Sequence, residues 1–414
     1  MPAERSGGSK RGFAAVLAGL LVAAAILRVV LIIHMGSHYY FADTAEYDAA
    51  ARNILAGHGP GRDFPRAPLY PALMALGFAL FGKGNLAGVR MLQLIAGLAV
   101  VALTMRLGYR LGGRPGAVLA GAGAAIAPTL VFTTAMLYPT SLYTLLLLGV
   151  TLLAHALDTR PGPWRGAMLG LLMFLLWMTD QVAAAPLAAV LLWLLWGTWT
   201  KSSVPAQRWL RAVTVAIAVA TAVLLAAPWT IVQTRLIGGS AFFMEKAQMV
   251  LYFARADPDV GGSRALRDTA TVFRPLTTVE FVGREFRLLR GQPAPYVSDC
   301  VGEFVHFFQP MPDRIRTQNV YTSAGAKLVT ALYFLPVLIL GIVGLLFGGG
   351  PARDRRLLAL VPIGTAALYA LFFAQTRYRI PTEPQMLVLA ALGLVRLFPR
   401  LSATIAGASS AEPI

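Results

Sequence analysis

The stretch FADTAEYDAAARNILAGHG (residues 41–59), followed by RDFPRAPLYPALMALGFALFGKGNLAGVRMLQLIAG (residues 62–97), decides how this chain is arranged. Its apolar part Leu69–Phe81 is short and contains Pro71, whereas a helix needs about 20 apolar residues to cross a membrane. We therefore predict that Leu69–Phe81 is a re-entrant or interfacial helix and not a span. Residues 35–86 then form one long loop on a single face of the membrane.

The composition of the whole chain is that of a membrane protein. Of 414 residues, 57% are hydrophobic and 13% are charged, against roughly 25% charged residues in soluble domains. The net charge of +17 would suggest nucleic acid binding in a soluble protein, but in a membrane protein it first suggests basic cytoplasmic loops. The sequence has no GxxxxGK[ST] motif and no dinucleotide fingerprint. We expect neither nucleotide nor nucleic acid as a partner.

Apolar runs of membrane-spanning length recur along the rest of the chain. We predict an all-α polytopic membrane protein with about ten transmembrane helices and a small extracytoplasmic loop domain. The first run is too long for a signal peptide, so we expect it to stay uncleaved. The predicted spans are residues 12–33, 87–109, 115–136, 140–157, 164–179, 181–199, 209–231, 328–348, 356–374 and 380–397.

The basic residues orient this map. With the N-terminus in the cytoplasm, the inner segments hold basic clusters such as Arg106, Arg110 and Arg114, as the positive-inside rule requires. Counting Leu69–Phe81 as a span would move that cluster outside, so we reject this alternative. We expect an integral protein of the cell membrane, of bacterial plasma-membrane type. Its predicted parts are a cytoplasmic tail (1–11), a transmembrane region (12–231) with the outer loop 35–86, an extracytoplasmic domain (232–327), C-terminal helices (328–397) and a second cytoplasmic tail (398–414).

Four motifs in chain order resemble one family of enzymes. The first loop has an acidic residue after the first span, an amphipathic helix and the element Arg-Ala-Pro-Leu-Tyr; the other motifs are APTLVFTTAMLYPTSLYTLLL (127–147), AAPWTIVQTRLIGG (226–239) and TRYRIPTEPQMLVLAALGL (376–394). Together they resemble the GT-C membrane glycosyltransferases, in particular the protein O-mannosyltransferases and lipid A aminoarabinose transferases (glycosyltransferase family 39-like). The resemblance implies a GT-C-like fold. It also implies transfer of a sugar from a polyprenyl-phosphate carrier to a glycan, lipid or protein acceptor outside the cytoplasm.

Asp43 is the residue whose position matches the acceptor-activating acid of that family. Transfer to a hydroxyl needs a base to take its proton, and a carboxylate can serve. On a helix, Asp43, Glu46 and Tyr47 share one face, so Glu46 and Tyr47 are candidate supports of the site. The alternative is structural, because Asp-Thr-Ala-Glu also has the form of a helix-capping box.

Three arginines and a tyrosine are candidates for binding the donor phosphate. Arg66 and Tyr70 belong to the Arg-Ala-Pro-Leu-Tyr element, and arginine can bind phosphate with two nitrogens. The alternatives are a snorkelling arginine and a tyrosine that anchors the interface. Arg377 and Arg379 lie at an outer membrane edge, where the positive-inside rule disfavours them. They bind the anionic donor, or Arg379 pairs with Glu383 one turn later.

Two positions between spans bear on whether the site is complete. Relatives often carry an acidic residue where this chain has Thr140, and this departure puts metal dependence and activity in doubt. Asp180, in the turn between two spans, or Glu46 could replace that acid. The alternative for Asp180 is that it simply caps a helix. We name no metal ligand, and a divalent cation stays an open alternative. Arg28, inside the first span, is either functional or snorkels toward water.

Three functions stay open on the sequence. The first is a glycosyltransferase that inverts the anomeric centre by single displacement, with Asp43 as the base. The second is a transporter or flippase of lipid-linked saccharide, although no internal repeat of the kind common in transporters is visible. The third is a GT-C relative without activity that acts as an assembly partner.

Overall fold

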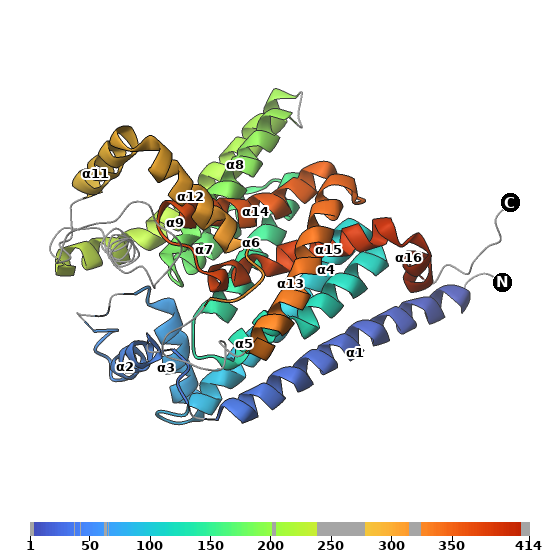
Figure 1. Cartoon of the computed structure of the whole chain (residues 1–414), viewed down its shortest axis with the longest axis horizontal. Helices are drawn as coiled ribbons and strands as arrows, with labels where there is room; N and C mark the ends of the chain where they lie inside the picture. The colour runs from blue at the N-terminus through green and yellow to red at the C-terminus, as the bar shows by residue number, and fades with distance from the viewer. Residues whose placement is uncertain are drawn as a thin grey trace.

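Every apolar run predicted from the sequence forms helix in the computed structural model, which describes residues 4–36, 38–41, 43–61, 64, 66–200, 204–237, 278–313 and 324–406 (Figure 1). In these ranges the structure is all-helical, as predicted. The helices that carry the runs are α1 (Glu4–Met35), α4 (Leu86–Ile126), α5 (Pro128–Ala135), α6 (Thr140–Thr159), α7 (Pro163–Trp177), α8 (Ala184–Thr200), α9 (Pro205–Ile237), α13 (Ala324–Phe347), α14 (Ala352–Leu371) and α15 (Glu383–Leu397).

Helix α4 is a hairpin that holds the predicted run 87–109 and the first part of the run 115–136, which continues after a break at Ala127 in α5. Its backbone leaves the helical region at Gly113, where φ is 60°, and the chain reverses there. Beyond the turn, the backbones of Gly108 and Gly116 approach so closely that a Cβ on Gly108 would lie 2.4 Å from the Gly116 carbonyl oxygen. Only glycine permits this approach, so the two legs pack backbone against backbone.

Seven helical segments in the described ranges are long and apolar enough to cross a membrane. The hairpin α4 is one of these seven, although it contains one predicted span and the first part of the next. Two other predicted runs fall outside the seven. Helix α7 has 15 residues, and α14 begins with the charged stretch Arg353–Arg356. A membrane protein is therefore indicated, and ten crossings stay a prediction.

The predicted short helix of the first loop is confirmed as helix α3 (Leu69–Phe81). The amphipathic helix before it is α2 (Asp43–Leu55), and the two pack around a shared aromatic core. In Figure 1 they lie together near the end of α1 and the start of α4. The buried side chains of this core include Tyr47, Phe64, Tyr70, Met74, Phe78 and Val89.

The turns rich in arginine gather at one end of the bundle. Arg114 in the α4 turn lies over the Phe13 ring of α1, 5.3 Å from its centroid, and also donates to the carbonyl of Ala406. Ala406 ends the short helix α16 (Pro399–Ala406), so the predicted C-terminal tail begins in helix. Arg110 donates to the His155 carbonyl at 3.0 Å, which brings the end of α6 to the same place.

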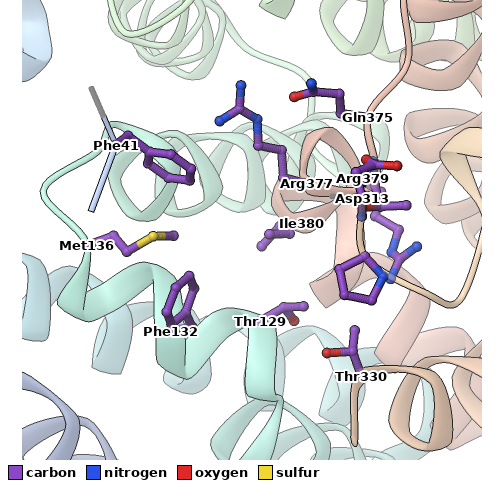
Figure 2. A pocket seen from close by; sticks show the side chains of 12 residues that line it. Phe41, Thr129, Phe132, Met136, Asp313, Thr330, Gln375, Arg377, Arg379 and Ile380 are labelled. Carbon is purple, nitrogen blue, oxygen red and sulfur yellow. Dashed lines mark hydrogen bonds between the residues drawn. The ribbon is translucent and has the colours of Figure 1, made fainter. Parts of the chain in front are cut away.

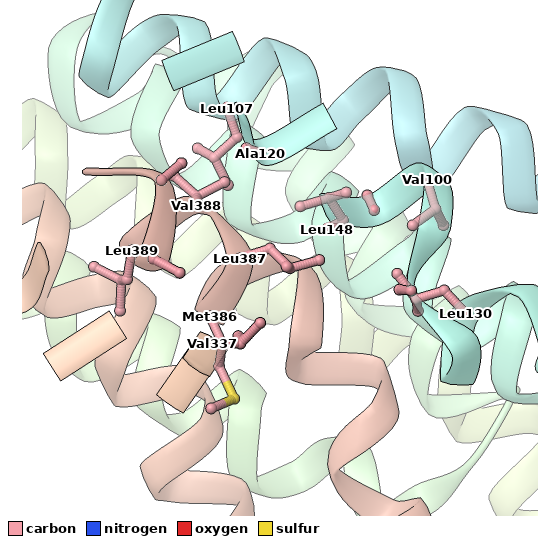
Figure 3. Close-up of a cluster of buried hydrophobic side chains, with 14 of the residues drawn as sticks. Val100, Leu107, Ala120, Leu130, Leu148, Val337, Met386, Leu387, Val388 and Leu389 are labelled. Atoms are coloured by element: carbon pink, nitrogen blue, oxygen red, sulfur yellow. The ribbon is translucent and has the colours of Figure 1, made fainter. Parts of the chain in front are cut away.

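The core of the bundle joins α4, α6, α13 and α15 (Figure 3). Arg28 of α1 is fully buried beside it and donates to the carbonyls of Ala124 and Ala125 at 3.2 and 3.0 Å. Pro128 has no N–H with which to bond the Ala124 carbonyl. Arg28 therefore completes a broken helix end, and the prediction that it snorkels is wrong because its side chain does not reach water.

The predicted extracytoplasmic domain is described in part. Its visible helices are α11 (Thr278–Gly291) and α12 (Pro293–Phe307), and α12 packs against α14 through Phe307 and Ala366. Residues 238–277 and 314–323 of that predicted domain lie outside the described residues.

Candidate functional site

Asp43 is the first residue of α2, at the end of the bundle opposite the arginine-rich turns. Its Oδ2 accepts a hydrogen bond from the Tyr138 hydroxyl at 3.3 Å, and its Oδ1 lies 3.1 Å from Arg66. The side chain is about one-third exposed (32%), so the carboxylate is fixed by two partners while one part of it faces outward. The capping box predicted from the sequence makes Asp43 the N-cap, so that the helix would start at Thr44. In the structure α2 starts one residue earlier, at Asp43 itself.

Arg66 is neutralised by two carboxylates. Its Nε donates to Glu46 at 2.9 Å, its other end pairs with Asp43, and its guanidinium lies 5.3 Å from the centroid of the Tyr47 ring. Burial alone would lower the pKa of Arg66, but the neighbouring Tyr47, Glu46 and Asp43 raise it overall. Arg66 is therefore a permanent cation whose charge is already used to hold Asp43 and Glu46.

Arg377 has a different environment. It lies on the 3₁₀ helix η2 (Thr376–Thr382), and its guanidinium is 4.9, 5.8 and 5.4 Å from the ring centroids of Phe41, Tyr138 and Tyr378. Its Nε is buried without a hydrogen-bond partner. Among the described residues no ion pair joins Arg377 to a carboxylate, in contrast to Arg66. Arg377 is thus a cation that lies among aromatic faces, with a side-chain hydrogen bond to Tyr378 and the charge of Asp43 in its surroundings.

Two cavities meet at Arg377. The first is mainly apolar and appears in Figure 2; its lining includes Phe41, Thr129, Phe132, Met136, Asp313, Thr330, Gln375, Arg377, Arg379 and Ile380. The second is richer in hydroxyl groups; its lining includes Tyr138, Thr140, Tyr143, Asp180, Thr365, Tyr369, Arg377 and Tyr378. Of the lining residues, Arg377 is the one that both cavities share. An anion bound to it could extend an apolar part and a polar part in different directions.

Asp180 and Thr140 line the same cavity. The Asp180 carboxylate accepts the Val182 N–H at 3.2 Å, which is the predicted helix-capping contact. Tyr143, in the same lining, is buried and its hydroxyl has no partner.

The structure places two other predicted residues in structural contacts. Arg379 is 1% exposed and lies 3.3 Å from Glu383, the pairing offered as the alternative to donor binding. Tyr70 is fully buried and its hydroxyl donates to Gln93 at 3.4 Å. It reaches neither cavity lining, and the interpretation as an interface anchor is wrong because the side chain is enclosed in the core.

The sequence analysis did not single out Tyr138, which joins the parts of this site. The Tyr138 hydroxyl donates to Asp43 while its ring faces Arg377. Burial raises the pKa of Tyr138, so the phenol stays a proton donor. The available signal was its place in the second loop motif, next to Pro139 and Thr140. Phe41, two residues before Asp43, was missed in the same way.

The described residues do not form a ligand set for a divalent cation. Within them no group of three or more His, Cys, Asp or Glu side chains gathers. Asp43 and Glu46 are both engaged by Arg66, and Asp180 accepts a backbone N–H. We therefore derive no step through a metal ion.

Comparisons with known proteins show the fold. No protein-family model matches the sequence, and no match was found among curated proteins. Among solved structures, the chain is similar to ArnT from Cupriavidus metallidurans bound to undecaprenyl phosphate, with a TM-score of 0.58 and 16% identity over 96% of this chain. It is also similar to the oligosaccharyltransferase AglB from Archaeoglobus fulgidus in complex with an inhibitory peptide and a dolichol-phosphate, with a TM-score of 0.56 and 16% identity over 96% of this chain. The chain spans 62% of ArnT and 52% of AglB. The predicted GT-C-like fold is confirmed.

Proposed function

We propose that this chain is an integral membrane glycosyltransferase that moves a sugar from a polyprenyl-phosphate carrier to an acceptor on the extracytoplasmic face. The observation that carries the proposal is Arg377, a half-buried cation between an apolar and a polar cavity that forms no ion pair with a carboxylate among the described residues. A lipid phosphate linked to a sugar has this shape and charge. It is an anion with an apolar chain on one side and hydroxyl groups on the other.

The proposed role of Arg377 is to bind the carrier phosphate. A guanidinium can give a phosphate two parallel hydrogen bonds. The electrostatic attraction between the two groups is stronger in a site with little water. The ligands of the similar structures support this role, because the ArnT structure holds undecaprenyl phosphate and the AglB structure holds a dolichol-phosphate. We assign the phosphate to Arg377 in preference to Arg66 and Arg379, since both of these are paired with carboxylates.

The proposed role of Asp43 is that of the base. Its carboxylate takes the proton of the acceptor hydroxyl while the hydroxyl oxygen attacks the anomeric carbon. The bond from that carbon to the phosphate oxygen breaks, and the lipid phosphate leaves with the bonding electrons, facing Arg377. One displacement inverts the anomeric centre. Arg66, Glu46 and Tyr47 hold Asp43 in place, and Asp180 is the candidate contact for a sugar or acceptor hydroxyl.

The proposed orientation has both chain ends in the cytoplasm and the Asp43 end of the bundle outside, in a bacterial plasma membrane. The arginine-rich turns at the end of the bundle opposite Asp43 support it. With α4 counted as two legs, and with α7 and α14 included, the helices supply ten crossings. Helix α3 then stays on the outer side as a re-entrant or interfacial helix.

The test is a transfer assay in membranes fed with a labelled carrier-linked sugar. We expect Asp43→Asn to lower the transfer rate about 100- to 10,000-fold, since the base is lost and the shape is kept. Asp48→Asn is the matched control, because Asp48 is on the same helix and pairs with Arg52 at 2.8 Å. Full transfer by Asp43→Asn would overturn the mechanism.

Thr140 favours a second candidate function, that of an inactive relative acting as an assembly partner. It stands where relatives often have an acidic side chain, although Asp180 lines the same cavity. The discriminating measurement is made on the purified wild-type protein. Stable association with another subunit, together with no transfer from any carrier-linked sugar, would support the partner role.

A further inference from the structure

The backbone next to Arg377 is hydrogen-bonded to a segment from the predicted extracytoplasmic domain. This segment, residues 303–313, covers the end of α12 and the turn after it. Its first contact is Glu303, whose Oε2 accepts the N–H of Ala374 at 2.7 Å. Ala374 lies three residues before Arg377, so the contacts with this segment begin before Arg377 in the chain.

Asp313 makes the closest contact with the segment before Arg377. Its Oδ2 accepts both the N–H and the hydroxyl of Thr376, at 2.6 and 2.9 Å, and its own N–H donates to the Thr376 hydroxyl at 3.1 Å. Thr376 is directly bonded to Arg377 in sequence. Three hydrogen bonds therefore fix Thr376, the residue directly before Arg377. Both Asp313 and Arg377 line the cavity in Figure 2.

His306 keeps the Asp313 carboxylate charged and oriented. Its Nε2 lies 2.7 Å from the other carboxylate oxygen of Asp313. Burial alone would raise the pKa of Asp313, but the hydrogen bonds from His306 and Thr376 lower it overall. The hydrogen bond to Asp313 raises the pKa of His306 in turn. Asp313 is thus an anchored acceptor.

The chain after Arg377 is held as well. The ring of Tyr378 stacks on Tyr369, with centroids 4.3 Å apart and an angle of 9° between the planes. Tyr369 in turn stacks on Phe307 of α12 at 6.1 Å, and Arg379 donates to the Gln309 carbonyl. Residues 303–313 therefore contact Thr376 and Arg379 directly and Tyr378 through Tyr369. Arg377 itself has aromatic contacts and forms no ion pair with a carboxylate among the described residues.

We propose that Asp313 is a positioning residue for Arg377: by holding Thr376 it fixes the guanidinium between the two cavities, ready for a lipid-linked phosphate. The inference rests on the proposed function, because it concerns the same anion site. An arginine side chain that forms no ion pair can adopt many rotamers. Restricting it to one rotamer on binding reduces the affinity for the carrier. A fixed backbone removes part of that loss. Through this contact, the extracytoplasmic segment controls how tightly the carrier is bound.

The test is a double-mutant cycle on the full chain in lipid nanodiscs, with a short-chain polyprenyl phosphate as the probe. We expect Asp313→Asn to weaken probe binding about 10- to 100-fold, the loss typical of a misplaced binding group. On an Arg377→Gln background the same change should have no further effect, because Asp313 acts through Arg377. Equal losses on both backgrounds, or no loss on the wild-type background, would overturn the proposal.

Two further measurements separate positioning from general damage. Thr376→Val removes the hydroxyl but keeps the N–H, and it should weaken binding less than Asp313→Asn with the same dependence on Arg377. Hydrogen exchange of the peptide covering residues 373–380 should become faster in Asp313→Asn, while exchange in the core of the bundle stays as in the wild type. If the wild type binds no probe, the proposed function fails. Independently of probe binding, unchanged hydrogen exchange of residues 373–380 in Asp313→Asn would overturn the proposal that Asp313 holds Thr376 in place.

Discussion

The two ends of α6 both gather arginine side chains against aromatic rings, yet only one end balances their charge. At the Asp158 end, Arg211 and Arg353 lie 3.2 and 3.3 Å from the same carboxylate. At the Thr140 end, Arg377 lies over aromatic rings, and no ion pair links it to a carboxylate within the described ranges. A helix of 20 residues separates the two ends by roughly 30 Å.

We interpret this difference as that between a structural site and the proposed binding site. A half-buried cation that forms no ion pair is less favourable than a paired one, so an end of the bundle that only needed stability would supply an acid, as the Asp158 end does. Local rules of this kind are commonly broken where a protein binds its ligand. The Thr140 end has Asp43 nearby, but Arg66 takes its charge. In the proposed function, the carrier phosphate supplies the negative charge that faces Arg377.

The largest effect that would test this comparison is expected for Arg377→Gln. Loss of the cation that faces the leaving phosphate should reduce sugar transfer about 100- to 1,000-fold. The thermal midpoint should not fall, because no carboxylate among the described residues loses its partner. Transfer and melting are measured on the same membrane preparation. Activity within a few-fold of the wild type would remove Arg377 from the site.

At the other end of α6, Asp158→Asn should have the opposite result. The side chain is 2% exposed, and its removal leaves Arg211 and Arg353 facing each other without an acid. We expect a loss of about 3 kcal/mol in stability, seen as a lower thermal midpoint, with unchanged transfer per folded molecule. A stable variant with reduced transfer would mean that the two ends are not distinct.

Arg66→Gln separates the two roles considered for Arg66. If it holds Asp43 and Glu46, as its contacts indicate, kcat should fall roughly 10-fold while the dissociation constant of the carrier stays the same. If it binds phosphate, the dissociation constant should rise. Carrier binding and single-turnover transfer, measured side by side, decide between these outcomes.

The smallest effect concerns pH at the His306–Asp313 pair. The folded-state pKa of His306 is raised above its usual 6.5 by Asp313, so its contribution to stability is complete below about pH 6.5 and is lost as pH rises through the raised pKa. Hydrogen exchange of residues 373–380 should become modestly faster across that range. His306→Gln should abolish this pH dependence of hydrogen exchange. If the variant showed the same pH profile as the wild type, the prediction would be wrong.

The elements of the fold were largely predictable because lipid imposes a simple pattern. Leu69–Phe81 was predicted with the bounds that α3 has, since its length and Pro71 distinguish it from a span. The turn between residues 109 and 115 was predictable for the same reason, because two apolar runs flank Gly112 and Gly113.

The partners of the charged residues were predictable only over short distances. The pair Arg379–Glu383 spans one helical turn and could be named in advance. The contacts of Tyr138 with Asp43, or of Asp313 with Thr376, join residues 95 and 63 positions apart. Sequence spacing carries no signal for such contacts, so the difference between Arg377 and its neighbour Arg379 emerges from the three-dimensional arrangement alone.

The bond from Arg28 to the Ala125 carbonyl has a consequence for how the protein is made. The two residues are 97 positions apart, and at about 5–20 residues per second the ribosome needs roughly 5 to 20 seconds to cover that distance. During this interval α1 is already synthesised and its arginine lacks both carbonyl partners from α4, although the Ala24 carbonyl of α1 itself lies 3.1 Å away. The first helix must therefore wait at the membrane, through water, headgroups or the insertion machinery, until the hairpin α4 delivers the carbonyls that complete it. Assembly of the bundle thus has an order in time, set by one buried guanidinium.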